Sequence, residues 1–228
     1  MVQVNVNPKH LADLLYNASL LADAPEGTNG VEYVLLEVGE TKLKAYAAGS
    51  HTAGYGAIDL AKENDQGTFS VVITKAEAID LQSMVRRTSS AKSAVVVVDI
   101  DEDGQPYAHP EYGEYTANLV ITYGNEDICA IEDADPDGVL TDHWDRVEEL
   151  CKQREVGDTT SVTFKASSLA VVSKFKPPRE FLTLKTTKER FAMVVTEGWV
   201  VVVGDARPDG LHPEPPPSLQ EESSPPED

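Results

Sequence analysis

The feature that most constrains this chain is a repeated order of elements: one strand, one helix and then three strands. In the first copy, residues 2–6 alternate in polarity as a strand does, and Asn7-Pro8 begins a helix whose apolar residues recur at helical spacing as far as Ala22. Three strand patterns separated by turn residues follow at 32–38, 41–48 and 53–60. Residues 1–62 are therefore predicted to form one β-α-β-β-β unit.

A second copy is predicted in residues 67–132. A strand at 68–73 leads to Thr74, and Glu77 three residues later completes the capping box of a helix that runs to about Arg87. Its three strands are predicted at 94–100, 115–123 and 126–132. The two copies together make a first domain.

A third copy is predicted in residues 159–206. A strand at 159–164 precedes a helix at 165–175, which a pair of prolines ends. The turn Glu197-Gly198 joins the last two strands of this copy as a hairpin. Its three strands are predicted at 181–186, 191–196 and 199–203.

Two segments fall outside the repeat. Residues 133–158 carry one amphipathic helix, with Trp144, Val147 and either Leu150 or Cys151 on its apolar face, and they are too few for a fourth unit. We interpret them as a helical connector or a degenerate remnant of a unit. Residues 207–228 are predicted to be a disordered acidic tail, because six of the 14 prolines and six acids lie after position 208, with no Lys or Arg.

Composition limits the class of protein. A hydrophobic content of 41% supplies enough apolar side chains for a core, so wholesale disorder is excluded. No apolar run approaches the length of a membrane span, and the N-terminus has the pattern of a strand instead of a signal peptide. Two cysteines without metal-type spacing are typical of a reduced, cytoplasmic protein. A net charge of −20 normally argues against nucleic acid as a partner.

The positive charge is concentrated on one kind of element. The three predicted repeat helices and their flanks, residues 8–22, 74–92 and 165–179, hold nine of the 19 Lys and Arg but only three of the 39 Asp and Glu. The basic residues are Lys9, Lys75, Arg86, Arg87, Lys92, Lys165, Lys174, Lys176 and Arg179. One alternative is a set of solvated helix faces, with cations at the helix C-termini where the macrodipole favours them. That alternative does not explain why acids are almost absent from these helices.

A repeated β-α-β-β-β unit with basic helices on a very acidic chain resembles the sliding clamps, the ring-shaped processivity factors of DNA polymerases. The run VEYVLLEV at 31–38, followed by ETKLKAY at 40–46, looks like the stretch after the first helix of a bacterial-type clamp. The run FLTLKTT at 181–187, leading to the valines at 201–203, looks like the end of small clamp-like proteins from phages of actinobacteria. The resemblance implies an α+β DNA-clamp fold, with helices lining the inside and antiparallel sheets outside.

The resemblance also implies a function. The nine basic residues would face duplex DNA through loose, sequence-independent phosphate contacts, and encirclement would retain the protein on DNA. The partners would be double-stranded DNA, a DNA polymerase and a clamp loader, unless the ring opens by itself. No cofactor and no catalysis are implied, and the location would be the host cytoplasm if the protein is viral.

Two departures from the family pattern affect these expectations. Family rings contain twelve such units, so three units per chain imply a homo-tetramer, or a trimer if residues 133–158 stand in for a fourth unit. The chain also has GDARP at 204–208 where bacterial clamps end in a short strand that contributes to the pocket for partner peptides.

Other functions have less support from the residues. An acidic DNA-mimic inhibitor of a host DNA-binding enzyme fits the net charge but not the basic helices. A hydrolase has no catalytic constellation, since Ser50-His51 reads as a polar turn and the five histidines are scattered. The run 99–104 begins like a calcium loop but has Pro110 where a bidentate Glu is needed. The pair Gly54 and Gly56 lacks the rest of a nucleotide fingerprint.

Overall fold

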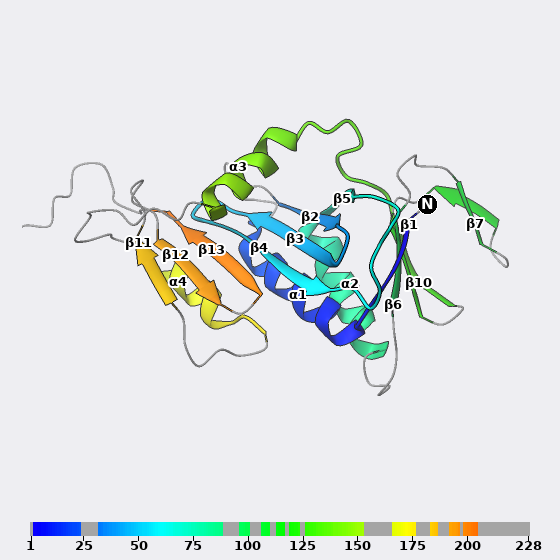
Figure 1. Ribbon diagram of the computed structural model, residues 1–228, viewed down its shortest axis with the longest axis horizontal. Helices are drawn as coiled ribbons and strands as arrows, with labels where there is room; N and C mark the ends of the chain where they lie inside the picture. The colour runs from blue at the N-terminus through cyan, green and yellow to red at the C-terminus, as the bar shows by residue number, and fades with distance from the viewer. Residues whose placement is uncertain are drawn as a thin grey trace, which may run out of the picture.

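The computed structural model describes residues 2–23, 32–88, 96–100, 106–109, 113–116, 119–123, 126–152, 166–176, 183–186, 192–196 and 198–204. The elements in chain order are β1 (Val2–Val6), α1 (Pro8–Leu21), β2 (Tyr33–Val38), β3 (Lys42–Ala48), β4 (Thr52–Asp59), β5 (Phe69–Thr74), α2 (Lys75–Thr88), β6 (Val96–Ile100), β7 (Pro106–His109), β8 (Gly113–Thr116), β9 (Leu119–Tyr123), β10 (Glu126–Ile131), α3 (Thr141–Lys152), α4 (Ala166–Ser173), β11 (Thr183–Thr186), β12 (Ala192–Thr196) and β13 (Trp199–Val203). Figure 1 shows them along the long axis of the molecule, with β11–β13 at one end and β1, β6 and β10 towards the other.

The strands form two principal antiparallel sheets and one separate hairpin. The large sheet has the order β11-β12-β13-β4-β3-β2-β5, the smaller sheet has the order β1-β6-β9-β10, and β7 pairs only with β8 among the described strands. The strand before α1, β1, lies in the smaller sheet, where it pairs with β6. The strand before α2, β5, lies in the large sheet, where it pairs with β2. This exchange joins residues 2–59 and 69–131 into one body.

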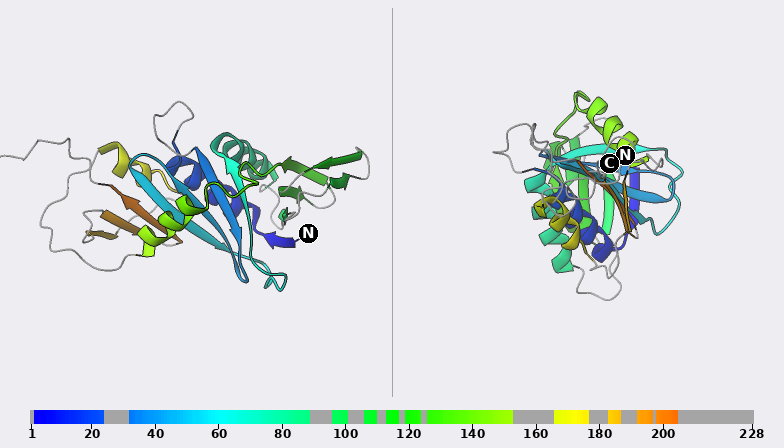
Figure 2. Two further views of the ribbon diagram at one scale, coloured as in Figure 1. Left: turned by 90° about the horizontal axis from the view of Figure 1, so that it is seen from above. Right: turned by 90° about the vertical axis from the view of Figure 1, so that its left-hand side faces the viewer.

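The helices lie on opposite faces of the large sheet. In β3, Leu43, Ala45 and Ala47 belong to the apolar cluster that contains α1, whereas Tyr46 and Ala48 belong to the cluster that contains α3. The same alternation in β13 assigns α4 to the α1 face, because side chains on a strand point to its two faces in turn. Helices α1, α2 and α4 therefore cover one face and α3 covers the other, as Figures 1 and 2 show.

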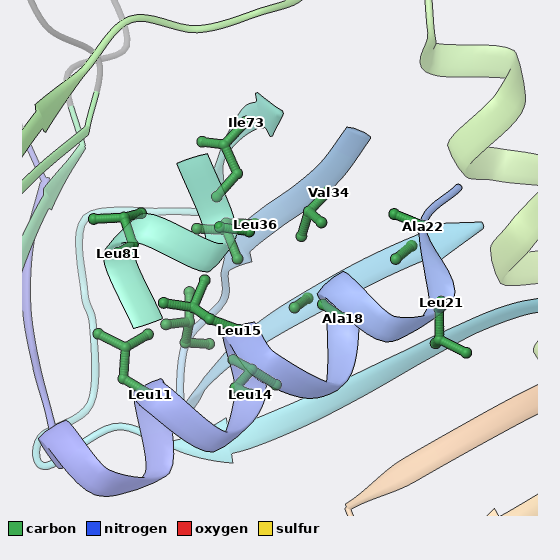
Figure 3. Packing of buried hydrophobic residues seen from close by; sticks show 14 of the residues in the cluster. Leu11, Leu14, Leu15, Ala18, Leu21, Ala22, Val34, Leu36, Ile73 and Leu81 are labelled. Atoms are coloured by element: carbon green, nitrogen blue, oxygen red, sulfur yellow. The ribbon is translucent and has the colours of Figure 1, made fainter. Parts of the chain in front are cut away.

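The larger core lies between α1, α2 and the two sheets. Figure 3 shows Leu11 and Leu15 of α1 near Leu81 of α2, with Leu36 behind them, and all four side chains are at most 1% exposed. The apolar spacing predicted for the first helix is thus the spacing of its buried face. Burial of side chains of this size contributes about 1.5–3 kcal/mol each.

Two of the three predicted starts of the repeat helices are confirmed, and the third, at residue 165, lies outside the described residues. The Asn7 side chain accepts hydrogen bonds from the Lys9 and His10 N–H groups, with Pro8 in the first helical position. At α2, the Thr74 hydroxyl accepts from the Glu77 N–H at 3.2 Å, and a Glu77 carboxylate oxygen accepts from the Thr74 N–H at 2.7 Å. This is the reciprocal capping box that the sequence predicts.

Close packing explains the glycine pair in β4. Gly54 and Gly56 lie opposite Val201 and Trp199 where β4 pairs with β13. A Cβ atom on Gly56 would overlap the indole ring of Trp199, and one on Gly54 would lie 2.6 Å from the Val200 carbonyl oxygen. These glycines therefore allow the seam between β4 and β13 to close.

One predicted element is wrong and two lie outside the described residues. The single strand predicted at 115–123 is two strands, because β8 ends at Thr116 and pairs with β7, and β9 begins at Leu119 and pairs with β6 and β10. The local β7–β8 pairing competes with the longer strand and removes its first part from the sheet. The strand predicted at 159–164 and the tail at 207–228 fall outside the described residues. The predicted 197–198 hairpin is confirmed, since Thr196 pairs with Trp199.

Candidate nucleic-acid interface

The candidate interface is the face of the molecule that carries α1, α2 and α4. Six of the nine basic residues predicted for it belong to the described part of the chain: Lys9, Lys75, Arg86, Arg87, Lys174 and Lys176. The other three, Lys92, Lys165 and Arg179, lie outside it. The fold therefore brings helices from three distant parts of the sequence to one face. This is necessary if their basic residues are to form one interface.

Four of the six basic side chains are exposed. Lys9 lies in the first turn of α1, Arg86 and Arg87 lie in the last turn of α2, and Lys174 directly follows α4. The C-terminal positions of the two arginines also suit the helix macrodipole. These four exposed cations therefore lie in, or directly after, helices that share one face of the large sheet.

Lys75 has a structural partner within the protein. Its ammonium group donates a hydrogen bond to the carbonyl oxygen of Ala22, at the C-terminal end of α1, and burial lowers its pKa. A lysine in this position satisfies a carbonyl that the end of a helix leaves without an intrahelical donor. The sequence pattern gave no sign of this contact, because Ala22 and Lys75 are distant in sequence.

Lys176 is held through its backbone as well as its side chain. The Asn17 carboxamide donates to the Lys176 carbonyl oxygen at 2.8 Å and accepts from the Lys176 N–H at 2.8 Å. The Lys176 ammonium lies 4.3 Å from the centre of the Tyr16 ring, which is within the range of a cation–π interaction. The half-buried Lys176 is therefore fixed against α1, with its charge near the surface.

A depression of about 400 Å³ lies beside these residues, between α1, the β3–β4 pair and the turn before β13. Lys9 and Lys176 line it together with Lys42, which the sequence analysis did not select. Asp13 and Asp59 also line it, and the Lys42 ammonium lies 3.7 Å from an Asp59 carboxylate oxygen. Three lysines and two aspartates line the depression, so it carries charges of both signs with a small excess of positive charge.

The opposite face carries a polar cluster next to α3. The Lys44 ammonium donates to a Glu37 carboxylate oxygen at 2.7 Å and to the Tyr46 hydroxyl at 3.3 Å. Burial by itself would lower the pKa of Lys44, but the hydrogen bonds to Glu37 and Tyr46 and the charges of these two groups together outweigh it and raise that pKa. Burial, followed by the Glu37 charge, raises the pKa of Tyr46 to about 12. The cluster contains a cross-strand ion pair between Lys44 and Glu37. The raised pKa values of Lys44 and Tyr46 keep these two groups protonated near neutral pH.

The sites that the sequence analysis set aside remain without support. The Ser50 hydroxyl and N–H both donate to the Asp23 carboxylate, as expected of a polar turn. The described residues contain no group of three His, Cys, Asp or Glu side chains placed to hold a metal ion. The start of the calcium-like run is in β6, and its continuation at 101–105 is outside the described residues.

Within the described part of the chain, no helix is long and apolar enough to span a membrane.

The chain has an α+β fold of antiparallel sheets, with α1, α2 and α4 on one face of the large sheet and α3 on the other, and this is the fold of the DNA sliding clamps. Its structure resembles the DNA polymerase sliding clamp of Bacillus subtilis with a TM-score of 0.61 and 10% identity, over 93% of this chain and 66% of that one. It resembles A. fulgidus PCNA, in a structure with the C-terminal region of FEN-1, with a TM-score of 0.58 and 10% identity, over 91% and 99% of the two chains. It resembles the Helicobacter pylori beta clamp bound to a DNA ligase peptide with a TM-score of 0.56 and 13% identity, over 93% and 68%.

These similarities are structural only. No protein-family model matches the sequence, and no curated protein does. The chain spans about two thirds of the length of the bacterial clamps that it resembles, 66% in the case of Bacillus subtilis. The comparison with PCNA covers nearly all of both chains.

Proposed function

We propose that this protein is a DNA sliding clamp of bacteriophage type, a non-enzymatic ring of identical chains that encircles duplex DNA and tethers a replicative DNA polymerase. The observation that carries the proposal is the exposure of Lys9, Arg86, Arg87 and Lys174 on the α1–α2–α4 face of a chain with a net charge of −20. In a clamp fold this is the face that would line the central hole.

The proposed mechanism needs no tight contact. Exposed lysine and arginine side chains attract phosphates without reading base edges, so the protein can slide along any sequence. Lys92, Lys165 and Arg179 remain sequence-based members of the same surface. Lys75 and Lys176 contribute their charge to the potential in the hole while serving as internal contacts.

Closure of the ring would use sheet edges. Among the described strands, β10 ends the smaller sheet, and an edge strand has backbone groups that can pair with another chain. Partner proteins would bind through short segments of their chains, since the C-terminal region of FEN-1 is bound to A. fulgidus PCNA and a DNA ligase peptide is bound to the H. pylori clamp. A polymerase and a clamp loader are the partners that we expect here.

The test is retention on circular DNA. Nicked circular plasmid is mixed with the protein and the loader of its host, and protein that stays with the DNA during gel filtration is measured before and after the plasmid is linearised. The triple variant Arg86→Glu, Arg87→Glu, Lys174→Glu is expected to lose retention, because it reverses three charges in the proposed hole. The matched control reverses three exposed charges elsewhere, Lys62→Glu, Arg146→Glu and Lys152→Glu, and should retain DNA as the unmodified protein does.

The net charge of −20 favours one rival function, an acidic DNA mimic. A mimic would not stay on circular DNA and would instead compete with DNA for a DNA-binding enzyme. Retention of the triple variant at the level of the unmodified protein would show that the helical face does not line a DNA channel.

A further inference from the structure

The segment α4–β11–β12–β13 lacks the neighbours that its counterparts have. Helices α1 and α2 pack along each other, and each of the sheets beside them receives a strand from the other set, β5 beside β2 and β1 beside β6. In both cases the added strand lies next to the first strand of a three-strand meander. These exchanges complete the two halves of the first domain.

The corresponding position beside β11 is vacant in the described structure. β11 is the first strand of the meander β11–β12–β13, and among the described strands it pairs only with β12, which leaves it at the end of the large sheet. The opposite end of this meander is already paired, since β13 bonds β4. The vacancy is therefore on the side where the other two meanders take up a strand.

The helix of this segment, α4, also lacks a neighbouring helix among the described residues. No described helix packs along α4 as α2 packs along α1, and α4 lies mainly on β13. Its eight residues, ASSLAVVS, contain no charged side chain, although the chain as a whole is 25% charged. Leu169 is 36% exposed and Val171 only partly buried. A surface helix normally has a charged outer face, so this composition indicates a face that another protein surface covers.

Helix α3 does not supply the missing neighbour. It packs on the opposite face of the large sheet, where Trp144, Val147 and Cys151 meet Tyr46 and Val202. A fourth helix equivalent to α1, α2 and α4 would have to lie on their face. Residues 141–152 therefore do not take the place of a fourth unit's helix.

We propose that α4 and the β11 edge form a docking surface for a second copy of this chain, which presents its own α4 and β11 edge in the same place. The two α4 segments, one from each chain, would then form one domain shared by the two chains. The α1 and α2 halves of the first domain form such a domain within one chain. A two-fold interface of this kind uses the same patch on both copies, and the odd number of units in the chain leaves one unit in need of such a partner.

The inference rests on the fold and not on DNA binding. It goes beyond the proposed function because it restricts assembly to even numbers of chains and assigns two different contacts, one at α4 and one at the β10 edge. With three units per chain, four chains joined alternately by these two contacts would form a closed ring of twelve units. A trimer is inconsistent with the inference.

The experiment measures native mass and then the effect of one side chain. Sedimentation of the full chain across a wide dilution series should give species at even multiples of 24.7 kDa. Leu169→Glu should weaken the α4 contact at least about tenfold, because it puts a charge into an apolar interface. Ile79→Glu is the matched control, since Ile79 is 44% exposed on α2, which already has α1 as its neighbour. Circular dichroism checks that both variants fold.

A cross-linking arm keeps the inference testable if Leu169→Glu fails to fold. In a Cys129→Ser background, Leu169→Cys should be joined into two-chain species by a short bis-maleimide, while Ile79→Cys should not. A trimer, a monomer at every concentration, or unchanged assembly of a folded Leu169→Glu would overturn the inference, as would failure of Leu169→Cys to cross-link. If these results occur while the unmodified protein still stays on circular DNA, the docking surface is wrong and the proposed function stands.

Discussion

The side chain of Asn17 bonds both backbone polar groups of Lys176, 159 positions further along the chain. Asn17 is 1% exposed and Lys176 is half-buried, so both hydrogen bonds are partly buried. They attach the end of the α4 segment to α1, beside the seam where β13 pairs with β4. One buried amide thus joins the third set of elements to the first.

Replacement of Asn17 is expected to loosen this joint. Asn17→Ala removes the partner of the Lys176 N–H and carbonyl groups, and each buried group without a partner costs about 1–3 kcal/mol. The free energy of unfolding, measured with a chemical denaturant, should fall by an amount in that range or somewhat above it. Gln82→Ala on α2 is the matched amide control and should change it by no more than about 0.5 kcal/mol. Equal effects of the two variants would contradict a special role for Asn17.

The β4–β13 seam makes a second prediction. Gly56→Ala would force a methyl group into the Trp199 indole, so the ring or the strand must move, at a cost of at least about 1–3 kcal/mol. Gly39→Ala is the control, because its nearest neighbour would be the Lys42 carbonyl oxygen at an ordinary 3.6 Å. Thermal unfolding followed by tryptophan fluorescence compares them. A Gly56→Ala protein as stable as Gly39→Ala would show that the seam is looser than described.

The docking of α3 should depend on pH through His143. Burial lowers the pKa of His143 from its usual 6.5, and its Nε2 atom has no hydrogen-bond partner. The native state therefore binds fewer protons than the unfolded state, so this residue's contribution to stability falls as the pH drops below about 6.5.

The variant His143→Phe isolates that contribution, since it keeps a ring against Trp144 but cannot titrate. Denaturant unfolding of both proteins is measured from neutral to mildly acidic pH. The stability of the variant relative to the unmodified protein should be constant above pH 7 and increase below pH 6.5. A difference that stays constant throughout would show that His143 has the same affinity for protons in both states.

The alkylation rate of Cys151 should also depend on the docking of α3 on the large sheet. Burial between α3 and the large sheet raises the pKa of its thiol from 9.0 to about 12, so its thiolate fraction near neutral pH is about a thousandfold lower than in the unfolded chain. In a Cys129→Ser background, alkylation followed by mass spectrometry should therefore be at least about a thousandfold slower for the native protein than in denaturant. Similar rates would mean that α3 detaches readily. Trp144→Ala, which removes the largest buried side chain of α3, should accelerate the native reaction.

Much of the local structure was predictable because its causes are local. The Asn7-Pro8 helix start, the Thr74–Glu77 capping box and the 197–198 hairpin each depend on residues only a few positions apart, and each is confirmed. The prediction of one strand at 115–123 is wrong because apolar alternation does not reveal that β8 has its own partner in β7. Pairing partners compete across the chain, and a strand pattern alone does not rank them.

The candidate site was predictable as a charge pattern but not as a set of contacts. The sequence selected helices rich in Lys and Arg, and the fold brings the described ones to one face. It did not reveal that the ammonium group of Lys75 is bound to the end of α1. Asn17 and Lys42 had no pattern to select them, because their roles depend on residues that only folding brings near.

By itself, the sequence determined most of the element types and their order, except for the β7–β8 hairpin, and the concentration of positive charge on three helices. These follow from side-chain periodicity, helix capping and composition, which act over a few residues and are the same in any fold. Only the tertiary structure decided that β1 joins the smaller sheet and β5 the large one, and that α3 lies on the opposite face from α1, α2 and α4. It also decided that β11 is the last described strand of the large sheet and that Leu169 is partly exposed. Those outcomes depend on which apolar faces meet, and that is a property of the whole chain.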